Sequence, residues 1–326
     1  MNRWLRLSLP FVASLSVAAT ALGQAAPPAQ PGPPPAAAQG PGRGGPPQPV
    51  IIGPPAPIPA EVAIPRPTPS ELAEVNAAVK RLIAADTSAA KPLLQKFESV
   101  LLLEPPRLNV ATTFTQTTQR MGARHLGFVE RAQQGNIDLL LHGDSITDWW
   151  VQGEANTAVF NKYFGGYRTA NFAIAGDTTQ GVLWGLRNGE GQGFQPKAVM
   201  LMIGTNNSGG TDNAGTMTAA EIAEGVGAVV LELKRNFPNA KILLLAIFPR
   251  GLPGDSIRTK LAETNRIISR LDDQKSVFYL DIGQKFLDST GAFLPDSFRP
   301  DNLHPATKGY EIWGEAVKDK LAELMK

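Results

Sequence analysis

The chain has 326 residues and a formal net charge of +2, with charges of both signs spread along it. This balance indicates no polyanion-binding surface, so nucleic acid is not an expected partner. There is no cysteine, and the three histidines lack metal-type spacing. These counts exclude disulfides and thiolate metal sites and imply neither a metal nor a cofactor.

Residues 1–23 have the pattern of a secretory signal. Arg3 and Arg6 make a basic start, an apolar stretch follows, and small residues precede Gln24. The stretch is shorter than the roughly 20 apolar residues that a membrane span needs. We therefore expect cleavage before Gln24, export to the periplasm or the extracellular space, and no integral membrane span in the mature chain. An uncleaved anchor is the alternative.

Residues 24–69 hold most of the chain's 28 prolines, with Ala, Gly and Gln between them. Such a composition buries too little apolar surface to offset the entropy of ordering the chain. The sequence therefore predicts an extended, disordered linker over 24–69. It would act as a tether or spacer, or be a leader with no binding role.

Residues 70–134 are predicted to form a helical annex. Apolar residues at helical spacing predict helices over 70–83, 89–103 and 113–134, the last leading into the first strand. We expect the annex either to rim the active site or to be a structural collar beside the core.

From residue 135 onward, apolar runs alternate with helical patterns. Strands are predicted at 136–142, 171–175, 199–203, 240–248 and 277–281, and helices at 218–237, 255–271 and 308–325. This alternation predicts an α/β fold with a parallel sheet and right-handed crossovers, in one catalytic domain over 135–326.

A serine follows the first strand directly, in the turn Gly143-Asp144-Ser145. Ligands of open α/β sheets bind at the carboxyl ends of the strands, so Ser145 is a candidate nucleophile. A serine nucleophile needs a base. His304 lies in a proline-flanked loop with Asp301, which can orient the imidazole as triad chemistry requires. His125, on a predicted helix, and His142, on the first strand, are the other histidines.

An oxyanion also needs hydrogen-bond donors, and two further strand ends supply candidates. Gly176 follows the second strand and can offer a backbone N–H with no side chain in the way. Asn206 follows the third strand and can offer a side-chain amide. The sequence thus places Ser, Gly and Asn at successive strand ends, with Asp and His near the C-terminus.

These blocks, in this order, resemble those of the SGNH, or GDSL, hydrolase superfamily. The stretches 176–179, 182–190, 204–207 and 248–251 resemble more closely the catalytic subunits of platelet-activating-factor acetylhydrolase Ib. The resemblance implies a three-layer α/β/α sandwich with a flavodoxin-like, five-stranded parallel sheet. It implies Ser145 as nucleophile, with His304 and Asp301 completing the triad. It also implies an oxyanion hole formed by the N–H groups of Ser145 and Gly176 and the amide of Asn206.

The superfamily acts on many esters, so the substrate is a separate question. We expect a secreted esterase that releases short acyl groups, acetyl above all, from a glycan or small-molecule ester. The alternatives are a lipid or phospholipid short-acyl hydrolase and an inactive glycan-binding module on the same fold. The sequence indicates no oligomeric state. The candidates for the substrate pocket, or for support of the catalytic residues, are Asp144, Asp177, Asn207, Trp149 and Arg250.

Overall fold

A computed structural model describes residues 51–209 and 217–326. Its centre is a five-stranded sheet in the order β2-β1-β3-β4-β5, and every pairing is parallel. The strands are β1 Leu139–Gly143, β2 Thr169–Asn171, β3 Ala198–Met202, β4 Lys241–Leu245 and β5 Val277–Leu280. The predicted parallel α/β fold is confirmed. The predicted signal and the linker as far as residue 50 lie outside the described residues.

Helices precede the sheet and connect its strands. The longer ones are α1 Pro69–Ala85, α4 Ala123–Gln133, α6 Gly153–Phe164, α8 Ala219–Asn236, α9 Ser256–Ile268 and α10 Thr307–Leu324. Shorter ones are α2 Lys91–Lys96, α3 Glu98–Leu101, α5 Ser145–Asp148, η3 Trp149–Val151, α7 Thr179–Gly185 and η5 Asn206–Ser208. None of the helices in the described ranges is both long and apolar enough to cross a membrane.

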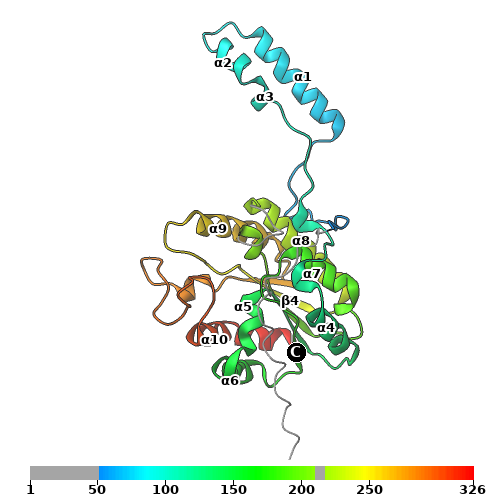
Figure 1. Ribbon diagram of the computed structural model, residues 1–326, viewed down its shortest axis with the longest axis vertical. Helices are drawn as coiled ribbons and strands as arrows, with labels where there is room; N and C mark the ends of the chain where they lie inside the picture. The colour runs from blue at the N-terminus through cyan, green and yellow to red at the C-terminus, as the bar shows by residue number, and fades with distance from the viewer. Residues whose placement is uncertain (1–50, 210–216) are drawn as a thin grey trace, which may run out of the picture. The chain divides into compact units, whose positions relative to one another are not determined.

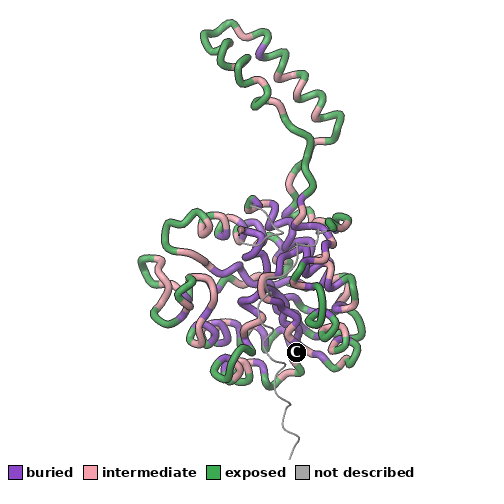
Figure 2. The backbone as a smooth tube through the Cα atoms, viewed as in Figure 1, coloured by how far each residue is buried: buried purple, intermediate pink, exposed green. Residues whose placement is uncertain are grey.

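The helices form a layer on each face of the sheet (Figure 1). α6 and α10 pack together on one face, and α8 packs between α7 and α9 on the other. β1 and β3 are therefore buried along their whole length, as expected for parallel strands covered on both sides. Figure 2 shows buried residues concentrated in the sheet and in the helices against it.

An aromatic cluster anchors the segment that follows β1. The Trp150 ring lies 5.0 Å from that of Phe164, 4.6 Å from that of Tyr310 and 4.9 Å from that of Trp313. The Tyr310 hydroxyl also donates to the backbone oxygen of Ile146 at 2.9 Å. These contacts tie α5 and η3 to α6 and α10, so the first turn after β1 is rigidly placed.

The helix predicted over 113–134 is too long at its start, because α4 begins only at Ala123. The hydroxyls of Thr112 and Thr113 donate to backbone oxygens three residues earlier, which favours a local turn over a helix. Gly122 then has a φ of 104°, a left-handed conformation that ends the irregular segment.

The linker predicted over 24–69 is wrong for residues 54–66, which are ordered against the core. Ala56 donates its N–H to the Thr112 oxygen at 2.7 Å, and Pro55 pairs with Thr113 in an antiparallel bridge. Val62 is only 3% exposed, and Arg66 forms an ion pair with Glu224 on α8. Proline disfavours helices but can still be buried, so a high proline content did not by itself show that this segment is disordered.

Candidate active site

The turn after β1 places Ser145 at the sheet edge. Ser145 is the first residue of α5, and the Asp144 side chain caps that helix by accepting the N–H of Ile146 at 3.0 Å. A side chain at Gly143 would place its Cβ only 2.3 Å from the Met202 oxygen. Glycine thus lets the turn pass close to β3 and aim the serine at the carboxyl edge.

Three side chains form a continuous chain at this edge. Ser145 Oγ lies 2.8 Å from His304 Nε2, and His304 Nδ1 lies 2.7 Å from Asp301 Oδ2. Burial alone would raise the pKa of the Asp301 carboxyl. The backbone and imidazole N–H groups of His304 and the backbone N–H of Leu303 outweigh that effect and hold the pKa below its usual range. An ionised Asp301 can therefore orient the imidazole toward Ser145.

The loop that carries Asp301 and His304 is closed at its base. Arg299 donates its backbone N–H to the His304 oxygen at 2.8 Å, and Phe298 pairs with Pro305 in an antiparallel bridge. Asp301 Oδ1 accepts the backbone N–H groups of Leu303 and His304, both at 3.0 Å. The carboxylate thus fixes the loop as well as the imidazole.

The two predicted oxyanion residues meet through Asp177. Gly176 has a φ of 80°, which favours glycine. Asn206, 8% exposed at the start of η5, donates its side-chain N–H to the Asp177 backbone oxygen at 2.7 Å. Its amide is therefore oriented by the loop that carries Gly176. The structure brings Ser145, Gly176 and Asn206 to the ends of three adjacent strands.

The candidate pocket residues contact other parts of the protein. Asp144 is fully buried, and burial raises the pKa of its carboxyl to about 7. Asn207 joins η5 to the start of α7 by accepting the Thr179 N–H at 3.0 Å. Arg250 donates to the backbone oxygen of Thr205 at 3.3 Å and so supports the Asn206 turn. Trp149 stacks on the His304 ring.

A buried ion cluster lies beneath the Gly176 loop, and sequence reasoning missed it. Arg120 is fully buried and forms ion pairs with Asp177, at 2.7 Å, and Glu190. Glu190 also bonds His125 Nδ1 at 2.7 Å. A single arginine in a polar segment carries no sequence signal of burial, because its partners lie more than 50 residues away. The Asp177 carboxylate is thus paired with Arg120 inside the protein.

The remaining histidine, His142, is a core residue. It is fully buried on β1, and burial together with the charge of Arg120 lowers its pKa well below the usual range. Neither ring nitrogen has a hydrogen-bond partner in the described part of the chain. His142 is therefore neutral and separate from the Ser145–His304 pair.

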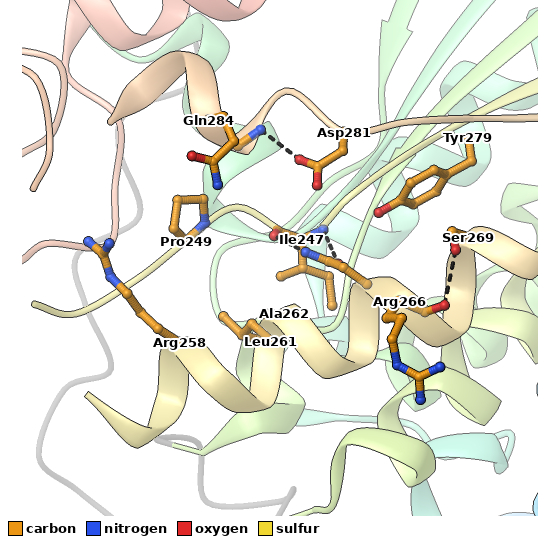
Figure 3. Close-up of a pocket in the computed structure, with 12 residues that line it drawn as sticks. Ile247, Pro249, Arg258, Leu261, Ala262, Arg266, Ser269, Tyr279, Asp281 and Gln284 are labelled. Carbon is orange, nitrogen blue, oxygen red and sulfur yellow. Dashed lines mark hydrogen bonds between the residues drawn. The ribbon is translucent and has the colours of Figure 1, made fainter. Parts of the chain in front are cut away.

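A pocket of about 370 Å³ lies beside the sheet rather than at Ser145. Figure 3 shows it between α9, which contributes Arg258 and Arg266, and the end of β5, which contributes Tyr279 and Asp281. None of Ser145, Asp301 and His304 lines it. Within residues 51–209 and 217–326, no group of three or more His, Asp or Glu side chains could hold a metal ion.

Comparison with known proteins gives one consistent result. The sequence pattern of the GDSL-like lipase/acylhydrolase family matches residues 141–312, more than half of the chain. Platelet-activating factor acetylhydrolase IB subunit alpha2 of Rattus norvegicus is 34% identical over 223 residues, which are 68% of this chain and 92% of that protein. The platelet-activating factor acetylhydrolase IB subunit beta homolog of Drosophila melanogaster is 35% identical over 153 residues, 47% of this chain and 63% of that protein.

A solved structure from Streptococcus pneumonia, named as a platelet activating factor, shares the fold at 20% identity and a TM-score of 0.50. The alignment covers 61% of this chain and 91% of that one. The resemblance seen in the sequence blocks is thus confirmed over the sheet and the helices around it. The chain belongs to the GDSL-like lipase/acylhydrolase family and is a carboxylic ester hydrolase.

Proposed function

We propose that this protein is an exported serine esterase that removes short acyl groups, acetyl above all, from carbohydrate. The contacts from Ser145 Oγ to His304 and from His304 to Asp301, at 2.8 and 2.7 Å, are the observation that supports ester hydrolysis by a serine nucleophile. A nucleophile, a base and a group that orients the base are all within hydrogen-bond reach of one another.

In the first half-reaction, Ser145 Oγ attacks the ester carbonyl carbon and His304 Nε2 takes the hydroxyl proton. The carbonyl oxygen becomes an oxyanion, to which the Ser145 and Gly176 N–H groups and the Asn206 amide donate. The intermediate collapses by breaking the bond to the alcohol oxygen. That oxygen leaves with the proton from His304, and the acyl group stays on Ser145.

In the second half-reaction, a water molecule attacks the acyl carbon while His304 takes one of its protons. The bond to Ser145 Oγ then breaks, and His304 returns its proton to the serine. The products are the free carboxylic acid and the original enzyme. Asp301 stays ionised throughout and stabilises the imidazolium that forms in each half.

Burial at the site supports a short acyl group. Ser145 is 6% exposed and Asn206 is 8% exposed, so little of either residue is open to a bulky acyl group. An acetyl group needs little room beyond the oxyanion hole, whereas a long acyl chain needs an apolar channel of its own.

The rim of the site is polar, which supports a carbohydrate as the alcohol. The Arg299 guanidinium donates to Gln152 at 3.1 Å beside the catalytic loop. The Gln119 amide lies close to Gly176: a Cβ added at Gly176 would be only 3.2 Å from Gln119 Nε2. Hydroxyl-rich ligands are recognised by such amide and guanidinium groups. The export pattern of residues 1–23 supports a substrate outside the cytoplasm.

A lipid short-acyl hydrolase is the second candidate. It is favoured by the 34% identity to the rat acetylhydrolase subunit over 68% of this chain. Both candidates use the same chemistry and differ in the alcohol that leaves.

A substrate series tests the proposal. We expect p-nitrophenyl acetate to be hydrolysed faster than the butyrate and octanoate esters. We also expect acetylated oligosaccharide to be hydrolysed faster than platelet-activating factor. Ser145→Ala should lose both turnover and covalent labelling by a fluorophosphonate. Preference for platelet-activating factor would favour the lipid candidate, and wild-type protein that neither turns over nor labels would indicate a binding module.

Export is tested separately from catalysis. Full-length chain produced in a bacterial host should be recovered outside the cytoplasm with its N-terminus at Gln24. Replacing Arg3 and Arg6 by glutamate should retain the chain inside, because the basic start directs insertion. Recovery of full-length chain from the membrane fraction would instead indicate the uncleaved anchor.

A further inference from the structure

The catalytic histidine has an aromatic neighbour that the triad does not require. The Trp149 and His304 rings are stacked, with centroids 4.0 Å apart and planes inclined by 29°. Trp149 lies four residues after Ser145, at the start of η3. One short segment therefore supplies both the hydroxyl on one edge of the imidazole and an indole against its face.

Trp149 is held both through its backbone and through its ring. Its backbone oxygen accepts the side-chain N–H of Asn156 at 3.0 Å, and Asn156 in turn accepts the Thr307 hydroxyl at 2.8 Å. The Arg299 guanidinium lies over the same ring, 4.5 Å from its centroid. Trp149 is thus fixed to α6, to α10 and to the catalytic loop.

We propose that Trp149 is a positioning residue that holds the His304 ring in the plane defined by Ser145 and Asp301. Its π face also stabilises the imidazolium that forms when the serine proton is transferred. This inference rests on the proposed role of His304 as the general base. The sequence made Trp149 a candidate either for the substrate pocket or for support of the catalytic residues, and this proposal assigns it the second role.

Two physical effects follow from the stack. A cation over an aromatic face is stabilised by the ring's negative electrostatic potential, and His304 carries a positive charge only after it takes a proton. The stack therefore favours the transition state over the neutral resting state, which raises kcat rather than substrate affinity. The face contact also limits rotation of the imidazole away from Ser145.

The charges around His304 set the sign of the pH effect. Asp301 bonds Nδ1 from the same loop. Arg299 lies over Trp149, and Arg250, after β4, interacts with Asp301 and with Asp144 beside the nucleophile. Among these, the indole and Asp301 favour a protonated imidazole, whereas the two guanidinium groups oppose it.

Substitution of Trp149 tests the proposal in the full-length protein. Trp149→Leu keeps apolar volume without a π face, and Trp149→Phe keeps an aromatic face. For p-nitrophenyl acetate, Trp149→Leu should lower kcat by about 3- to 30-fold with little change in KM, as expected for loss of a cation–π contact. Trp149→Phe should retain most of kcat. The fluorophosphonate inactivation rate should follow the same order.

The pH–rate profile separates this role from simple packing. In Trp149→Leu the acid limb should move to lower pH, because the protonated imidazole loses a stabilising face. In Arg299→Gln it should move to higher pH, because a positive charge near the imidazole is removed. Circular dichroism and thermal melting of each variant establish that the compared proteins are folded.

The outcomes are distinct. Unchanged kcat in folded Trp149→Leu overturns the proposal, and so does a rise in KM alone, which would make Trp149 a substrate contact. Equal loss in the leucine and phenylalanine variants, or acid limbs that move in the same direction in Trp149→Leu and Arg299→Gln, would show that the indole only fills space. Failure of His304→Ala to remove activity would refute the proposed general base itself, independently of Trp149.

Discussion

Asn206 shows how one side chain links two parts of the site. Its amide nitrogen carries two hydrogens. The contact from that nitrogen to the Asp177 oxygen, at 2.7 Å, orients the amide relative to the Gly176 loop. A fixed amide is what the proposed oxyanion role of Asn206 requires, because such a donor must be in place before charge develops on the substrate.

Asn206→Ala should lower kcat by on the order of 10²–10³ with little change in KM, because the donor acts on charge present only in the transition state. Steady-state kinetics with p-nitrophenyl acetate measure the effect. Asn207→Ala is the neighbouring comparison. Asn207 accepts the backbone N–H of Thr179 at the start of α7. We therefore expect Asn207→Ala to lower the free energy of unfolding and to change kcat little. A raised KM with unchanged kcat would assign Asn206 to substrate binding instead.

Asp144 should make the protein less stable as pH rises. Burial raises the pKa of its carboxyl to about 7 in the folded state, against an ordinary value near 4 when unfolded. Between these values the folded state keeps a proton that the unfolded state has lost. Unfolding therefore releases a proton, and the free energy of unfolding falls across this window by up to about 4 kcal/mol.

Asp144→Asn should remove that decline. The amide oxygen can still accept the Ile146 N–H, so the cap on α5 is kept. We expect urea unfolding to show a gain in stability over the wild type that is larger at pH 8 than at pH 5. Parallel stability–pH curves for the two proteins would mean that Asp144 does not titrate in this range.

At the level of single residues, the sequence marks candidates for the reactive groups, but it does not show which residues from other segments will contact them. Ser145 and the pair Asp301 and His304 are marked by turn chemistry and by spacing along the chain. Arg120 and the stacking of Trp149 on His304 depend on partners from other segments. No local pattern specifies which residue will face them.

Among the elements, the segment before α4 and the Gly176 loop depend on each other through Arg120. Its guanidinium is fully buried between Asp177 and Glu190. Arg120→Leu should lower the free energy of unfolding by about 3–5 kcal/mol, because it leaves two buried carboxylates without their cation. Arg168→Ala removes an exposed arginine paired with Asp138 and should lower the free energy of unfolding far less, because water screens an exposed ion pair. Urea unfolding of both variants measures the difference, and equal losses would contradict the burial of the cluster.

Element boundaries were predictable where one physical effect dominates. β1 and β3 follow from apolar runs closed by glycine turns, and α8 follows from helical spacing after the Thr218–Glu221 capping box. The second strand was predicted over 171–175 but lies at Thr169–Asn171, where no apolar run marks it. The start of α4 was not predictable from spacing alone. The apolar spacing there predicts a helix, but the threonine hydroxyls bond the backbone locally and Gly122 has a positive φ, so the helix begins later.

On the scale of the whole molecule, a segment 70 residues or more before the sheet contacts α8, one of the helices that cover the sheet. Glu224 on α8 is a buried carboxylate that accepts two guanidinium N–H groups of Arg66 at 2.6 Å and the Ile64 N–H at 2.7 Å. Asn109 adds a further donor at 2.9 Å. Burial alone would raise the pKa of the Glu224 carboxyl, but these donors hold it below its usual range. The segment 54–66 therefore belongs to the catalytic fold.

Two truncations test where the functional molecule begins. A chain starting at Ile51 keeps the proposed triad, the oxyanion residues and the 54–66 segment. It should hydrolyse p-nitrophenyl acetate with the kcat of the mature chain. A chain starting at Pro67 loses Arg66 and Ile64, which leaves the Glu224 carboxylate with only Asn109 among these donors. Removing the partner of a buried charge costs about 3–5 kcal/mol, so this chain should unfold at lower urea or fail to fold.

Arg66→Ala in the longer chain is the matched point variant. It removes the guanidinium and leaves the backbone in place, so its stability should lie between those of the two truncated chains. Urea unfolding followed by circular dichroism, together with kcat for each chain, measures both effects. Equal stability of the chains that start at residues 51 and 67 would show that the 54–66 segment only lies on the core surface.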